Sequence, residues 1–187
     1  MRKLAAAGLA CGILLGFGVT TSWAGWNPLK SETADTSKAH SQEAAEAIAE
    51  FKSKDPSMKT FFEKAYGYAV FPTVGKGGIG IGGAYGKGEV YAKGQMIGTT
   101  SLTQVTIGLQ LGGQAYREII FFKDKAMLDQ FKSGKFEFSA QASAVAVTAG
   151  ASADADYNNG VAIFTMAKGG LMYEASVGGQ KFSFTSK

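Results

Sequence analysis

The chain has 187 residues, 45% of them hydrophobic and 18% charged, and this length suits a single folded domain. The composition excludes an intrinsically disordered protein, because disordered chains are poor in apolar residues. The net charge is +4 and falls to +2 without Arg2 and Lys3, which leaves 17 Lys+Arg against 15 Asp+Glu. A charge this small gives no reason to expect nucleic-acid binding.

The amino terminus has the pattern of an export signal. Arg2 and Lys3 precede an uncharged apolar stretch from Leu4 to Val19. Ser22-Trp23-Ala24 then places small residues at the two positions that a signal peptidase recognises. We therefore expect a signal peptide over residues 1–24, cleavage after its last residue, and a periplasmic location.

The single cysteine, Cys11, lies inside this expected signal. The exported chain would then contain no thiol, which excludes disulfides, thiol catalysis and cysteine metal ligands. The residues before Cys11 faintly resemble a lipoprotein acylation site. However, Gly8 stands where a leucine is wanted, and this argues against lipid anchoring.

Two short helices are predicted at the start of the domain, which we place at residues 37–187 after a polar leader at 25–36. Asp55-Pro56 separates the two helices, because aspartate is a good N-cap and proline suits the first helical position. The first helix has apolar residues at helical spacing, namely Ala44, Ala47, Ile48 and Phe51. The second has an apolar and a charged face, with Met58, Phe61, Phe62 and Ala65 against Lys59, Glu63 and Lys64.

The stretch from Gly75 to Gly88 contains eight glycines in fourteen residues. Its large side chains fall at odd-numbered positions, Ile79, Ile81 and Tyr85, whereas most of its glycines fall at even ones. As a strand it would have one apolar face and one nearly bare face, because successive side chains alternate. A bare backbone lets another element or a ligand approach closely. We expect a strand packed tightly beneath another element.

Downstream of Tyr66 the pattern is mostly that of strands separated by glycine turns. A short helix is expected from Asp124 to Phe131, and the small residues of 136–155 favour a closely packed strand over a helix. The fold class predicted is α+β: an antiparallel, glycine-rich sheet closing toward a barrel or sandwich, with one inserted short helix. The expected strands are 68–71, 77–85, 89–92, 101–111, 117–122, 161–167, 171–177 and 181–185.

No catalytic, metal or cofactor site is predicted. Gly78 to Gly83 matches G-x-G-x-x-G, but a dinucleotide loop needs a helix directly afterwards, and here a further strand is expected. His40 is the only histidine and is expected on the surface. Asp154 and Asp156 lack the spacing of a calcium loop, so a turn is the better interpretation.

Lysines and aromatic residues provide two competing interpretations. A helix with phenylalanines on one side and lysines on the other can lie on an anionic bilayer. Composition alone favours the alternative, in which the rings face the core and the lysines are simply solvated. The candidate lipid contacts are Lys59, Phe61, Phe62, Lys64, Lys76 and Lys87.

Several ordered blocks of the sequence resemble the SYLF domain family. They are Tyr68-Ala69-Val70-Phe71-Pro72, the glycine alternation from Gly75 to Gly88, Gly108–Gln114, Ile119–Phe122 and Lys168–Tyr173. The resemblance implies a lipid-binding module without catalytic residues. Some eukaryotic relatives also associate with actin through additional regions, and signal-bearing bacterial relatives are thought to bind phospholipid in the cell envelope. The resemblance therefore shifts the expectation toward membrane contact.

We expect a non-catalytic protein of the bacterial cell envelope that binds anionic phospholipid peripherally. The alternative is an envelope structural or protein-interaction module without lipid specificity. An enzyme is disfavoured, because the sequence offers neither a usable nucleophile nor a valid phosphate loop. Actin binding is not expected, because export would remove the protein from any cytoskeleton.

Overall fold

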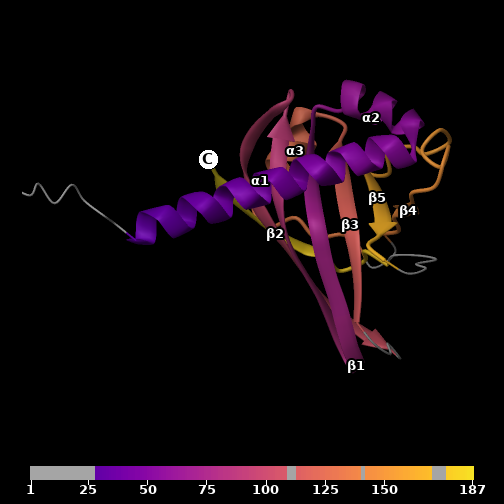
Figure 1. Cartoon of the computed structure of the whole chain (residues 1–187). Coiled ribbons are helices and arrows are strands. Elements are labelled where there is room, and N and C mark those ends of the chain that lie inside the picture. The colour runs from indigo at the N-terminus through magenta and orange to yellow at the C-terminus, as the bar shows by residue number, and fades with distance from the viewer. Residues whose placement is uncertain (1–27, 109–112, 140–141, 170–175) are drawn as a thin grey trace, which may run out of the picture.

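The computed structural model describes residues 28–108, 113–139, 142–169 and 176–187. Within these ranges the chain forms three α-helices, one short 3-10 helix and a six-stranded sheet (Figure 1). The expected signal peptide and Cys11 lie outside the described residues, as does most of the strand expected at 171–177.

The first helix, α1, spans Pro28–Lys54 and crosses one face of the sheet (Figure 1). At 27 residues it is not the short helix predicted, and residues 28–36 are helical instead of forming a polar leader. The first half of α1 extends beyond the sheet (Figure 1). A helix needs apolar residues at helical spacing only where it packs against another element, so the sequence pattern does not reveal this part of α1. The 3-10 helix η1 (Pro56–Met58) and the short α2 (Lys59–Lys64) follow.

The joint after α1 is formed by Asp55, the predicted N-cap. Its Oδ1 accepts from the backbone N–H of Ser57 at 3.0 Å, as predicted for a cap. The same carboxylate accepts from the backbone N–H of Gly150 at 3.2 Å and of Ser152 at 2.7 Å. Burial alone would raise the pKa of Asp55, but its hydrogen bonds with Ser57 and Ser152 outweigh burial and lower that pKa to about 2. Asp55 thus fastens the helices to a loop far along the chain.

The strands lie in the order β4-β5-β3-β1-β2-β6, and every pairing is antiparallel except β4 with β5. Within the described residues the sheet is open, with β4 and β6 at its edges, so the predicted closing toward a barrel or sandwich is not found. The strands are β1 (Gly67–Ala92), β2 (Gln95–Gly108), β3 (Gly113–Phe122), β4 (Val145–Ala146), β5 (Val161–Ala167) and β6 (Lys181–Ser186).

Strand β1 consists of two arms that pair with different neighbours. Its first arm, residues 67–77, pairs with β3, and its second arm, residues 80–92, pairs with β2. The chain bends back between the two arms. The bend is evident at Gly78, where an added Cβ would lie only 2.3 Å from the Cα of Gly82. The separate strands predicted at 68–71, 77–85 and 89–92 are therefore one. Pro72, which was expected to close the first, sits where the β1–β3 register shifts.

The bare face of the second arm packs directly against the first arm. A Cβ at Gly88 would lie 2.4 Å from the carbonyl oxygen of Val70, and one at Gly86 would lie 2.9 Å from Cγ2 of Val74. No side chain fits into such gaps. The prediction of a glycine strand packed tightly against another element is confirmed, and that element is the other arm of the same strand.

Two apolar cores result from this arrangement. The inner core contains side chains of both arms and of the helix α3 (Lys125–Lys132), among them Phe71, Val90, Leu102, Ile120, Phe131 and Phe182. The outer core lies between the sheet and the helices α1 and α2, and includes Phe51, Phe61, Val70, Ile119, Phe121 and Phe164. The sheet around the first arm is thereby covered on both faces.

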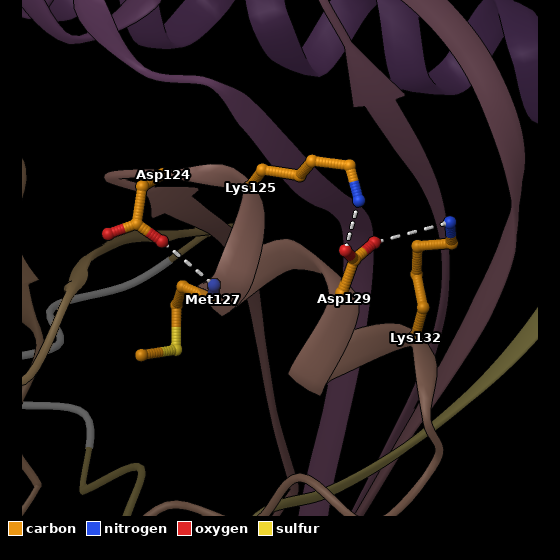
Figure 2. Close-up of polar contacts among 5 residues, drawn as sticks. All are labelled: Asp124, Lys125, Met127, Asp129 and Lys132. Carbon is orange, nitrogen blue, oxygen red and sulfur yellow. Dashed lines mark hydrogen bonds and ion pairs between the residues drawn. The ribbon is translucent and has the colours of Figure 1, made fainter.

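Helix α3 (Lys125–Lys132) agrees with its prediction. Asp124 caps it by accepting from the backbone N–H of Met127 at 2.9 Å, and Asp129 forms ion pairs with Lys125 and Lys132 (Figure 2). Its buried residues, Leu128 and Phe131, join the inner core.

The strand predicted over residues 136–155 is wrong for most of its length. Among the residues of this segment that the structure describes, only Val145–Ala146 is a strand, and residues 149–154 form turns. Small side chains bury little apolar surface, and two backbone N–H groups of this segment bind the Asp55 carboxylate instead of a neighbouring strand.

Candidate functional site

The outer face of the second β1 arm and β2 carries three large exposed hydrophobic residues. Ile81 is 72% exposed, Tyr85 52% and Val105 76%. Val105 lies opposite Gly83 in the β1–β2 register, so Ile81 and Tyr85 are its diagonal neighbours. We call these three residues the apolar stripe. Such a group of exposed apolar residues typically marks a contact surface.

The stripe follows directly from the glycine pattern. The even-numbered positions of the second arm must be glycine or small where the two arms touch, so these positions face inward. The large odd-numbered side chains are then forced outward by the alternation of a strand. On β2 the inward position next to Val105 is taken by Gln104, which is 3% exposed. At this place the apolar side chains therefore face solvent, whereas the polar side chain of Gln104 faces the interior of the protein.

The part of the chain that carries the stripe is almost free of exposed carboxylates. From Lys64 to Arg117 the sequence contains one carboxylate, that of Glu89, and Glu89 is only 4% exposed. The same stretch contains Lys76, Lys87 and Lys93. An anionic surface approaching the stripe would therefore meet lysines and almost no exposed carboxylate from this part of the chain.

A cleft of about 700 Å³ adjoins the stripe, between α1 and the outer face of β1, β2 and β6. Tyr85 belongs both to the stripe and to the cleft wall. Pro72 and Met96 add apolar surface to the lining, and most of the other lining residues carry polar groups, among them Lys87, His40, Ser41, Thr99, Ser101, Ser183 and Thr185.

Glu89 also lines the cleft, and both of its carboxylate oxygens already accept hydrogen bonds. Its Oε1 accepts from the hydroxyl of Ser41 at 2.6 Å, and its Oε2 accepts from the hydroxyl of Tyr91 at 2.6 Å. Burial and this bond to Glu89 raise the pKa of Tyr91 above its usual value, so Tyr91 stays a donor. Ser41 thereby ties α1 to the sheet beside the cleft.

The two phenylalanines predicted to contact lipid face the core. Phe61 is 7% exposed, and its ring lies 4.9 Å from that of Phe164. Phe62 packs edge-on against Phe121, and Lys52 lies over its ring at 4.4 Å. An amphipathic face suits a core as well as a membrane, and here the sheet takes it. Neither ring is presented to a bilayer in this structure.

The four predicted lysines do not gather in one place. Lys59 and Lys64 are exposed on α2, where Lys59 is 3.6 Å from Glu63. Lys76 lies opposite Gln114 in the β1–β3 register, in a shallow hollow that Lys168 also lines. Only Lys87 lies beside the apolar stripe.

Sequence reasoning missed the stripe as a site. It placed Ile81 and Tyr85 on an apolar face of the glycine-rich segment, without concluding that this face is exposed. The signal was present in the glycines. Once the bare face packs inward, the apolar face must be outside.

One ionisable group is fully buried in the inner core, away from this surface. Glu118 accepts at Oε2 from the side-chain amide of Gln180 at 3.0 Å, and the same amide donates to the Tyr116 hydroxyl at 3.2 Å. Burial raises the pKa of Glu118 to about 8.

Other sites find little support within the described residues. No group of three or more histidine, cysteine or acidic residues there is arranged to hold a metal. In the same residues no helix is both long and apolar enough to cross a bilayer. Gly78 to Gly83 lies inside β1 with more strand after it, so this motif has no helix N-terminus for a cofactor phosphate.

Comparison with known proteins identifies the family. A sequence model of the Ysc84 family, described as Las17-binding protein actin regulator and equivalent to the SYLF domain, matches residues 103–187. This chain belongs to the SYLF family. The resemblance is thus confirmed, although the glycine-rich blocks before residue 103 lie outside the matched segment. Beta cell expansion factor A of Aeromonas veronii, a SYLF protein, is 31% identical over 145 residues, covering 73% of this chain. This chain spans about half of that relative's length, 52%.

Proposed function

We propose that this SYLF protein binds anionic phospholipid surfaces peripherally through its apolar stripe. The observation that supports this is the exposure of Ile81, Tyr85 and Val105 on a part of the chain whose only carboxylate is buried. The proposed contact lies on the β1–β2 face, in place of the α2 helix suggested by the sequence.

The stripe would supply most of the binding free energy. Burying an exposed aliphatic side chain completely gains about 1.5–3 kcal/mol, and insertion into the headgroup region would recover part of this for Ile81 and Val105. A lysine near an anionic leaflet adds about 1 kcal/mol and is screened by salt. Lys87 lies beside the stripe, whereas Lys76 and Lys93 lie further along the same strand and hairpin. Binding should therefore weaken with salt without disappearing.

The role is proposed to be non-catalytic and located in the bacterial cell envelope. The amino-terminal pattern of residues 1–24 supports export. The names of the family and of the relative describe regulation and expansion, and neither names a reaction. The family description also mentions actin regulation. Export argues against that partner here.

The second candidate is a protein-interaction module in which the same stripe meets an envelope protein or a second copy of the chain. An exposed apolar stripe supports this role equally well. The charges favour the bilayer, because Lys87 lies beside the stripe and the one carboxylate between Lys64 and Arg117 is buried.

Vesicle co-sedimentation tests the proposal. The chain without residues 1–24 should bind vesicles rich in phosphatidylglycerol more strongly than vesicles of phosphatidylcholine. The double variant Ile81→Ser with Val105→Ser should lose most of this binding. Ala126→Ser on the exposed side of α3 is the matched control and should bind like the parent. Equal binding by the parent and the double variant would exclude the stripe as the contact.

A further inference from the structure

We propose that the cleft between α1 and the strands β1, β2 and β6 binds one phosphate ester group. The stripe alone explains attachment to a surface, whereas the cleft would select a particular group on that surface. The ester could belong to a lipid headgroup, in which case the inference rests on the proposed function. The ester could equally belong to a soluble molecule, in which case the inference is independent of the proposed function.

The first element of the site is a cation surrounded by hydroxyl donors. Lys87 lines the cleft, opposite Ser101 in the β1–β2 register. The hydroxyls of Ser101 and Ser183 lie 2.6 Å apart, and the Ser183 oxygen also accepts from the backbone N–H of Ser101 at 3.2 Å. One hydroxyl hydrogen satisfies this pair, so the second is left to donate to a ligand. Thr99 and Thr185 bring further hydroxyls from β2 and β6.

The second element is the α1 wall. His40 lines the cleft there, and its Nδ1 lies 3.7 Å from the Glu43 carboxylate. The His40 ring adds a hydrogen-bonding group on the helix side of the cleft, whereas Lys87 lies on the strand side. The one carboxylate in the lining, that of Glu89, already accepts from Ser41 and Tyr91. The lining thus presents Lys87, His40 and the hydroxyls to a ligand, and it contains no second carboxylate.

This set of groups suits a tetrahedral oxyanion. A lysine acts as a point charge for phosphate, and neutral hydroxyls donate to its several oxygens from different directions. The volume of about 700 Å³ is typical of a small-ligand pocket and exceeds the needs of phosphate alone, so the alcohol part of an ester also fits. Tyr85 connects the cleft to the stripe, which would place the acyl chains of a lipid ester on the apolar side.

A soluble probe tests the cleft directly. In an amide-resolved NMR titration of the chain without residues 1–24, glycerol 3-phosphate should shift the signals of residues 87, 99–101 and 183–185, and glycerol should not. Lys87→Gln should weaken the response about tenfold, the usual value of a charge-assisted hydrogen bond. Lys135→Gln, an exposed lysine outside the cleft lining, is the matched control and should behave like the parent.

A vesicle arm separates the two sources of phosphate. If only a lipid ester is bound, glycerol 3-phosphate shifts nothing, but Lys87→Gln still lowers binding to phosphatidylglycerol vesicles and leaves any binding to uncharged galactolipid vesicles unchanged. A phosphate-binding cleft is excluded if neither response depends on Lys87 more than on Lys135. The proposed function fails separately, when the Ile81→Ser and Val105→Ser double variant keeps full vesicle binding, whatever the soluble probe does.

Discussion

The two arms of β1 belong to one strand yet use opposite arrangements of side chains. In the first arm large residues fill both cores, with Phe71 in the inner core and Val70 in the outer core. In the second arm the inward positions near the contact are glycine, and the large residues Ile81 and Tyr85 lie in solvent. The first arm is built for stability on both faces. The second gives up side-chain packing on one face so that the backbones can touch, and leaves the other face free for contact.

The largest effect is expected where the two arms touch. Gly88→Ala would place its Cβ 2.4 Å from the Val70 carbonyl oxygen and 2.8 Å from the Phe71 ring, so the arms must separate. We expect a loss of about 3 kcal/mol or more in the free energy of unfolding, at the upper end for overpacking. Urea unfolding measures it.

Gly75→Ala is the matched control for this substitution, because a Cβ there has no atom within 4 Å among those described. Its effect should be about 0.5 kcal/mol or less, with a possible gain from reduced chain entropy. Equal losses at the two glycines would contradict the contact between the arms.

The next largest effect concerns the helical cover of the first arm. Asp55→Ala would leave the backbone N–H groups of Gly150 and Ser152 without their acceptor and remove the cap of η1. We expect a loss of about 2–4 kcal/mol at neutral pH, measured by thermal or urea unfolding. Asp124→Ala, which removes a more exposed cap on α3, should cost about 1 kcal/mol.

The lowered pKa of Asp55 fixes the pH dependence of this term. The folded value of about 2 lies below the ordinary 3.8, so the stabilisation is complete above pH 3.8 and disappears as the pH falls through 2. The difference in stability between the parent and Asp55→Ala should shrink over this acid range. A constant difference down to pH 2 would contradict the ionised cap.

How much of the fold the sequence predicts depends on whether each feature is determined by residues close together in the chain or by distant ones. The Asp55 and Asp124 caps and β6 have local causes, and they were predicted correctly. The loop at 149–154 depends on a partner that is distant in the sequence, and the helix at 28–36 extends beyond the sheet. Neither was predicted. A local pattern carries no information about such partners.

The site shows the same limit. The amphipathic face with Phe61 and Phe62 could not be assigned to core or membrane from one sequence, because both environments want the same residues. Lys87 was identified through its place beside the glycines. The exposure of Val105 depends on which face the two arms use to pack, and this is a property of residues far from it in the sequence.

A smaller effect is expected across from the first arm, inside the inner core. Glu118 lies opposite Phe71, and its folded pKa of about 8 exceeds the ordinary 4.5. The contribution of Glu118 to the free energy of unfolding is fully present below pH 4.5 and is lost as the pH rises through 8. Glutamine cannot ionise, so Glu118→Gln should avoid roughly 1–3 kcal/mol of this loss in the free energy of unfolding. Between about pH 5 and 9 the variant should therefore become more stable relative to the parent. Parallel stability curves for the two proteins would exclude a proton on Glu118.

The smallest effect on stability is expected at the apolar stripe, and it separates the two arms most clearly. Ile81→Ser changes a side chain that is 72% exposed, so the free energy of unfolding should change by about 0.5 kcal/mol or less. Ile120→Ser, at a fully buried position of β3 opposite the first arm, should lose several times more. If vesicle binding falls while the urea midpoint of Ile81→Ser stays in place, the residue contributes to contact and not to the fold. A large loss of stability at Ile81 would instead mean that the second arm is packed on both faces, and the contrast between the arms would disappear.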